Sequence, residues 1–134
     1  MKKLTINEEV ELEDDYITKD TAFLAREKGY LIKGIEYAYA RGKTKPVYLL
    51  HGLVMLQTSR VLALRTTQSL LAKWIFKYHG VYITVRQGFS RTGKGGFFVP
   101  VIHNPASSTE PIARFKTKED AFEEGLKIAL NSLD

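Results

Sequence analysis

Residues 88–95, GFSRTGKG, come close to the glycine-rich loop that holds nucleotide phosphates. That loop reads G-x-x-x-x-G-K-[ST], in which backbone amides and the lysine bind phosphate and the final hydroxyl binds Mg²⁺. Gly95 stands where the hydroxyl is needed, and the next residues, GFFVPV, are typical of a strand instead of the helix whose amino end would face the anion. The pattern therefore predicts no nucleotide site, and its glycines indicate a hairpin turn.

Other residue types that could do chemistry are isolated in the chain. Cysteine is absent, and the spacing of the histidines does not match a metal motif: His51, His79 and His103. We therefore expect no catalytic residue, no metal and no cofactor. A small enzyme stays as an alternative, which would require Tyr82, Arg86, His103 and an acid to converge in a pocket.

The charge distribution suggests a binding surface. The chain has a net charge of +5, yet no acid lies between Glu36 and Glu110, because the acids gather toward the two ends. The middle therefore carries a positive field unless the acidic ends fold over it. Basic residues interleaved with an aromatic ring can follow a nucleic-acid backbone. The candidate polyanion-binding residues are Arg86, Phe89, Arg91, Lys94, Lys43 and Lys45.

The elements that position these residues begin with a short helix, capped by Thr18 or Asp20 and ended by Gly29. Strands are predicted near residues 35–39 and 47–50, joined by the turn RGKTKP. A second helix begins at the threonine pair 66–67 and ends at Gly80. Its apolar stripe is Leu70, Leu71, Trp74, Ile75 and Tyr78, with Trp74 as the core anchor.

A hairpin follows, in which residues 81–87 pair with residues 96–103. Pro100 interrupts the second strand, so we expect it at an edge or a bulge. Residues 111–117 predict a third strand, and a capping box at Thr117 begins a last helix. The apolar stripe of that helix is Phe122, Leu126, Ala129 and Leu130. The fold class is therefore α+β, an antiparallel sheet packed by helices, with α-β-β-β-α order in the carboxyl half.

Three blocks of the chain carry a resemblance: AREKGY at 25–30, TTQSLLAKWIFKYHGVYITV at 66–85 and FKTKEDAFEEGLKIAL at 115–130. They resemble a group of short, uncharacterised proteins of anaerobic gut bacteria and their phages or integrated elements. The resemblance implies a compact α+β accessory protein of mobile-element origin. Because the group has no established activity, no site residue is inherited from it.

The α-β-β-β-α order is also similar to that of double-stranded RNA-binding domains, which is a likeness of fold alone. Those domains place basic residues where the last helix meets phosphates. Here that helix begins with acids, among them Glu119, Asp120 and Glu123, which would repel phosphate. We keep the predicted order of elements and reject the RNA-binding activity.

We expect one domain over residues 1–134, with residues 1–15 extended or weakly ordered. The amino terminus lacks the apolar run of a signal peptide, and VYLLHGLVML is too short to span a bilayer, so we expect a cytoplasmic protein without a membrane partner. The predicted function is a non-catalytic accessory or interaction module that binds a protein partner or forms a homo-oligomer. The alternative is a weak electrostatic nucleic-acid binder that uses the basic hairpin.

Overall fold

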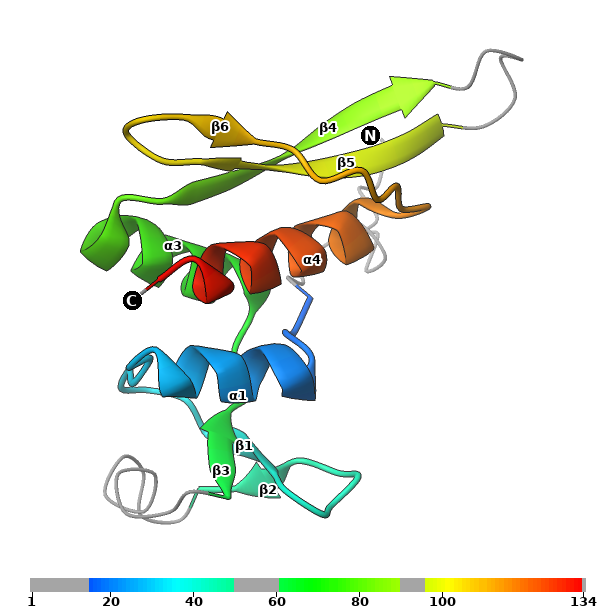
Figure 1. Ribbon diagram of the computed structural model, residues 1–134. Helices are drawn as coiled ribbons and strands as arrows, with labels where there is room; N and C mark the ends of the chain where they lie inside the picture. The colour runs from blue at the N-terminus through cyan, green and yellow to red at the C-terminus, as the bar shows by residue number, and fades with distance from the viewer. Residues whose placement is uncertain (1–14, 50–60, 90–95, 134) are drawn as a thin grey trace, which may run out of the picture.

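The computed structural model describes residues 15–49, 61–89 and 96–133. These residues form two antiparallel sheets of three strands each, with helices between them (Figure 1). The elements in chain order are α1 (Lys19–Glu27), β1 (Tyr37–Ala40), β2 (Val47–Tyr48), β3 (Leu62–Leu64), α3 (Gln68–His79), β4 (Tyr82–Phe89), β5 (Gly96–His103), β6 (Ser108–Thr109) and α4 (Lys118–Asn131). The predicted α+β class is confirmed.

The smaller sheet has the strand order β2-β1-β3 and packs against α1. Both strands predicted for this region are present, although β1 begins two residues later than expected. The sequence did not predict β3, which pairs with β1 so that Leu64 lies opposite Ala38. All three side chains of β3 are buried, so the segment lacks the alternation that marks a half-buried strand.

The larger sheet has the order β4-β5-β6, and its long hairpin is confirmed with continuous register from Tyr82↔His103 to Phe89↔Gly96. The prediction of a third strand over residues 111–117 was wrong, because the strand that pairs with β5 is Ser108–Thr109. Asn104 explains the earlier return: its side chain accepts the backbone N–H groups of residues 106 and 107 and turns the chain directly after β5. Only Phe115 of the predicted segment pairs, as a single bridge to Phe98.

Each described helix is capped by a threonine hydroxyl, supplied by Thr18, Thr67 and Thr117. Thr67 caps α3 while the hydroxyl of its neighbour Thr66 accepts a hydrogen bond from Tyr30 at 3.1 Å. Burial raises the pKa of the Tyr30 phenol, since its ionised form would lose water. Helix α3 ends at Gly80, whose φ of 70° is the left-handed conformation that glycine adopts without strain.

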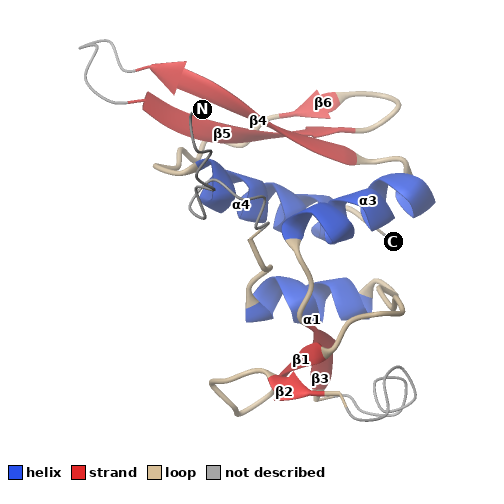
Figure 2. Cartoon of the chain, turned by 180° about the vertical axis from the view of Figure 1, so that it is seen from behind, coloured by secondary structure: helices blue, strands red, loops and turns tan. Residues whose placement is uncertain are grey.

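The core forms where α4 lies against the larger sheet and meets α3 and α1 (Figure 2). The stripe predicted for α4 is buried at Leu126, Ala129 and Leu130, with Phe122 packed against the core. The stripe predicted for α3 is narrower than expected, since Leu71 and Ile75 are buried while Leu70 and Tyr78 are 40% and 64% exposed.

Trp74, which the sequence predicted as a core anchor, packs against the core but is only partly buried. It lies at the margin of the core, half-buried, with its ring edge-on to Tyr30 at 5.1 Å and to His79 at 5.1 Å. The reason is geometric: a helix that packs on one side buries about three or four residues in every two turns, and Leu71 and Ile75 already occupy the central positions.

Candidate functional site

The structure separates the residues predicted to bind a polyanion. Arg86 and Phe89 lie on β4 of the larger sheet, and Phe89 is 74% exposed. Lys43 and Lys45 lie in the turn between β1 and β2 of the smaller sheet, on the far side of the helices (Figure 1). Arg91 and Lys94 lie outside the described residues. The described members therefore do not form one surface.

Arg86 is also less available than the sequence suggested. Its guanidinium donates to the carboxylate of Glu110, which follows β6. That hydrogen bond and the charge of Glu110 raise the pKa of Arg86 above its ordinary value. Glu110 is the first acid after the acid-free interval, so at this point an acidic part of the chain does fold over the basic middle.

No described helix covers the outer face of the larger sheet (Figure 2). Side chains of β4, β5 and β6 form a cluster around His103 on this sheet. The Tyr82 ring stacks on His103 with centroids 4.5 Å apart. The two imidazole nitrogens are within hydrogen-bond distance of hydroxyls, Nε2 at 2.8 Å from Thr84 and Nδ1 at 2.9 Å from Ser108. Phe76 of α3 meets Tyr82 edge-on at 6.0 Å.

Tyr82, Arg86, His103 and an acid therefore share one sheet face, which is part of what the enzyme alternative required. The acid, Glu110, is engaged by Arg86, and the described hydrogen bonds of the imidazole go to hydroxyls. The face is open, with Tyr82 46% exposed. The face therefore exposes rings and hydroxyls, and its described ion pair joins Arg86 to Glu110.

Backbone hydrogen bonds show which edge of β4 is open. Phe98 and Phe115 exchange two backbone N–H···O bonds, of 2.8 and 2.9 Å, so even-numbered residues of β5 direct their backbone groups away from β4. The direction alternates along a strand, so Val99 faces β4 and its partner Arg86 faces β5. The other residues of β4 then direct their N–H and C=O groups to the opposite edge: Ile83, Val85, Gln87 and Phe89. No described strand pairs with that edge.

The far edge of the same sheet is protected. Beyond β5, strand β6 pairs with Ile102 and His103, and Phe115 pairs with Phe98. Pro100 lies on β5, the central strand, between these two contacts. It is opposite Val85, and no bulge interrupts the register there. Its nitrogen, which carries no hydrogen, faces the part of the β5 edge that β6 does not cover. Proline is a common means of blocking an edge. Strand β4 has no proline, and its register with β5 is unbroken.

The helix that leads into β4 carries exposed positive charge, and its Phe76 ring meets Tyr82 at the start of β4. Residues 68–89, which comprise α3 and β4, contain Lys73, Lys77 and Arg86 and no acid. Both lysines are exposed, and so is Phe76 between them, at 57%. We call the open side of β4, together with this exposed face of α3, the β4 edge. It is basic and partly aromatic.

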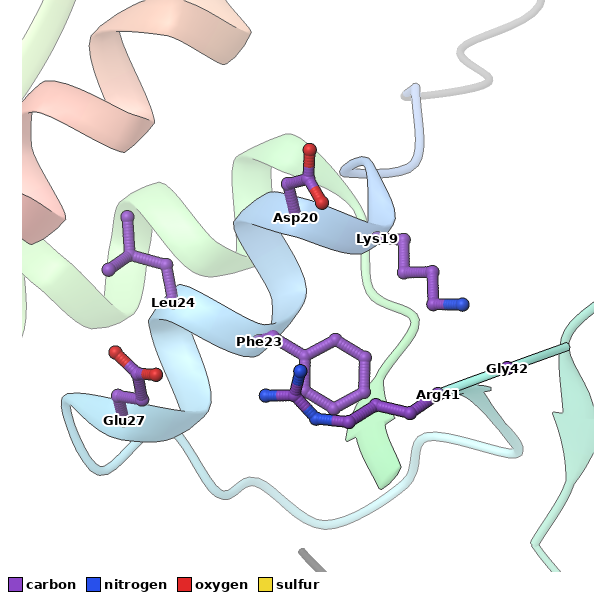
Figure 3. Close-up of a pocket in the computed structure, with 7 residues that line it drawn as sticks. All are labelled: Lys19, Asp20, Phe23, Leu24, Glu27, Arg41 and Gly42. Carbon is purple, nitrogen blue, oxygen red and sulfur yellow. The ribbon is translucent and has the colours of Figure 1, made fainter. Parts of the chain in front are cut away.

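Two hollows lie elsewhere on the molecule. The first, of about 400 Å³, lies between α1 and the end of β1, where the Arg41 guanidinium sits 4.3 Å from the centre of the Phe23 ring (Figure 3). Its remaining charges are of both signs, Lys19 against Asp20 and Glu27, and all come from exposed or half-exposed side chains. It shows no preference for one class of ligand.

The second hollow, of about 550 Å³, lies at the amino ends of α3 and α4 and includes Glu123. This buried carboxylate accepts the N–H and hydroxyl of Thr18 and the side-chain amide of Gln68, each at 3.0 Å. These hydrogen bonds join α4 to the starts of α1 and α3. Within residues 15–49, 61–89 and 96–133, no three histidine or acidic side chains gather as metal ligands would.

The chain matches no protein-family model, no curated protein and no solved structure. Among the described helices, none is long and apolar enough to cross a membrane. Sequence reasoning found β4 from its alternation but missed its open edge and the Arg86–Glu110 pair. The sequence signal for the open edge is Pro100. A proline on the second strand of the hairpin hinders pairing along that strand, whereas the first strand contains no proline.

Proposed function

We propose that the protein is a non-catalytic interaction module that binds an extended segment of a partner protein along the β4 edge. The observation that carries this proposal is an eight-residue strand whose alternate backbone groups face no described strand. An added strand would gain a row of main-chain hydrogen bonds, which is a recurrent mode of peptide recognition. Long unprotected edges are otherwise avoided, since they promote aggregation.

The charges beside the edge indicate the chemistry of the partner segment. Lys73 and Lys77 are exposed on α3, and no acid lies on α3 or β4. The exposed rings of Phe76 and Tyr82 offer apolar contact at the same place. A segment in which apolar and acidic residues alternate would place one kind on each face of the extended sheet. We therefore assign an acidic, alternating strand as the ligand.

A proline at Gln87 tests the edge directly. The Gln87 side chain is exposed and its N–H points to the open edge, so Gln87→Pro removes one donor and blocks strand addition without emptying the core. Gln87→Ala is the matched control, because it loses the same side chain and keeps the N–H. Fluorescence anisotropy with a labelled ten-residue peptide of alternating valine and glutamate measures the affinity. We expect Gln87→Pro to bind at least about tenfold more weakly, a loss of about 1.4 kcal/mol.

Equal affinity of the two variants would place the contact elsewhere and overturn the proposal. Absence of peptide binding to the parent chain would overturn it as well. A single-stranded oligonucleotide that binds while the peptide does not, with affinity falling steeply as salt is added, would replace the peptide partner with nucleic acid.

A further inference from the structure

A phenylalanine ring takes the place of the side chain that Gly88 lacks near the end of β4. Phe97 lies opposite Gly88 in the register of β4 and β5, and a Cβ built on Gly88 would overlap the tip of that ring. Glycine weakens the interior of a strand and often marks the close approach of another group. The Phe97 ring therefore reaches from β5 onto β4, the strand that forms the β4 edge.

Arg114 places a positive charge on this ring. Its guanidinium lies 4.2 Å from the centre of the Phe97 ring, which is a cation–π contact. The next residue, Phe115, bridges to β5 and so fixes this segment beside the sheet. Among the described residues, no acid forms an ion pair with Arg114, whereas Arg86 is paired with Glu110. The exposed guanidinium of Arg114 is therefore a cation that an acidic partner can reach.

The two faces of β4 offer different chemistry to an added strand. Ile83 is buried against α4 and Val85 is partly buried on the same side. Tyr82, Arg86 and Gly88 lie on the other side, because side chains alternate along a strand. An added strand of alternating pattern therefore places its apolar side chains on the side of the helices and its acids on the side of Arg86 and Gly88.

We propose that Arg114, held on the Phe97 ring, binds the acidic side chain that lies opposite Gly88 in the partner strand. Gly88 directs its backbone groups to β5, as Arg86 does. In an antiparallel partner, the residue opposite Gly88 then belongs to a pair without hydrogen bonds, in which side chains are closest. The methylene groups of a glutamate pack there against the electropositive edge of the ring, and its carboxylate meets the guanidinium.

This inference rests on the proposed function and names the residue that selects an acidic partner. Arg114 is the specificity-determining residue, because its guanidinium contacts the acid. Phe97 is a positioning residue, because it acts through Arg114.

Two ten-residue peptides, one alternating valine with glutamate and the other valine with glutamine, separate the charge from the main-chain contacts. The ratio of their affinities, measured by anisotropy at low salt, reports the selection for acid. Arg114→Gln should lower this ratio about threefold, which is typical of one exposed ion pair, and should leave the affinity for the glutamine peptide within about twofold. Lys116→Gln is the matched control, because it removes the same charge from an exposed side chain of the same segment, and it should leave the ratio unchanged.

Two further measurements test the contact itself. Phe97→Leu keeps the charge of Arg114 but removes the ring on which the guanidinium lies, so the ratio should fall in this variant as well. In the parent chain, the Nε–H resonance of Arg114 can be identified by its absence from Arg114→Gln. This resonance should shift when the glutamate peptide is added and should stay in place with the glutamine peptide.

An equal fall of the ratio in Arg114→Gln and Lys116→Gln would overturn the inference, because selection would then depend on net charge. An Arg114 resonance that moves equally with both peptides would overturn it as well, and an unchanged ratio in Phe97→Leu would contradict the positioning role of Phe97. Peptide binding that is weakened by Gln87→Pro but unaffected by Arg114→Gln would leave the proposed function standing and remove the inference. Failure of both peptides to bind the parent chain would overturn the proposed function and this inference together.

Discussion

Glu123 shows how one side chain can join three elements at the residue scale. It belongs to α4, yet its carboxylate accepts hydrogen bonds from Thr18 at the cap of α1 and from Gln68 at the start of α3. The side chain is only 8% exposed. A buried carboxylate is costly unless it is fully hydrogen-bonded, and here the three donors satisfy it. The sequence analysis counted Glu123 among the acids that would repel phosphate at the start of this helix, whereas the structure shows it buried and hydrogen-bonded within the protein.

Replacing Glu123 with Ala should therefore destabilise the fold strongly. The change removes the acceptor of the partly buried Thr18 N–H and one of the two acceptors of the Gln68 side-chain amide, for which a cost of about 1–3 kcal/mol is typical. Urea denaturation measures the loss. Glu124→Ala on the same helix is the control and should change stability by less than about 0.5 kcal/mol. Equal effects of the two substitutions would show that the hydrogen-bonded junction does not stabilise the protein.

Close packing of α4 on the hairpin decides the arrangement at the scale of elements. Gly125 lies where the helix crosses the sheet, and a Cβ built on it would stand 2.6 Å from Cγ2 of Ile83 and 3.0 Å from Cβ of Pro100. Glycine in a helix costs about 1 kcal/mol relative to alanine. The close approach of helix and strand is the reason that this position can hold a glycine in the middle of α4.

Gly125→Ala brings two opposing effects into competition. Helix propensity favours the substitution by about 1 kcal/mol, whereas overpacking of a core costs typically about 1–3 kcal/mol. The separation between the added Cβ and Ile83 is shorter than any normal contact distance. We therefore expect the packing cost to exceed the gain in helix propensity and the melting temperature to fall. Ile83→Ala in the same chain should relieve the overlap, so the double variant should lose less than the sum of the single losses. A rise in melting temperature for Gly125→Ala alone would contradict this account of the packing.

Separation of the two sheets by the helices defines the molecule as a whole (Figure 1). The β4 edge belongs to the larger sheet, whereas Lys43 and Lys45 project from a turn of the smaller one. Exposed charges that lie more than about 10 Å apart interact weakly at ordinary salt concentrations. The two parts of the candidate polyanion surface should therefore act independently.

Removing both lysines of the smaller sheet tests that independence. Lys43→Ala/Lys45→Ala should leave the affinity for the valine–glutamate peptide within about twofold, because screening isolates the β4 edge from this turn. Lys73→Ala/Lys77→Ala removes the same charge beside the edge and should weaken binding severalfold at low salt. Anisotropy titrations of both variants give the comparison. Similar losses of affinity in the two variants would mean that peptide binding depends on the net charge of the protein and not on the β4 edge.

Local patterns in the sequence determined much of the larger sheet and all three described helices. Alternation over residues 81–87 marked β4, and threonines followed by apolar periodicity marked α1, α3 and α4. These features depend on neighbouring residues, so they can be seen without the rest of the chain. The predicted α+β class follows from the same local patterns.

Tertiary structure alone decided the remainder, because each of its features depends on residues far apart in the chain. Strand β3 exists through pairing with β1, and Trp74 is only half-buried because Leu71 and Ile75 fill the centre of the helix contact. The pairing of Arg86 with Glu110 removed a charge that the sequence had assigned to a polyanion surface. The open edge of β4 likewise depends on which strands lie beside it, and no periodicity within β4 records its neighbours.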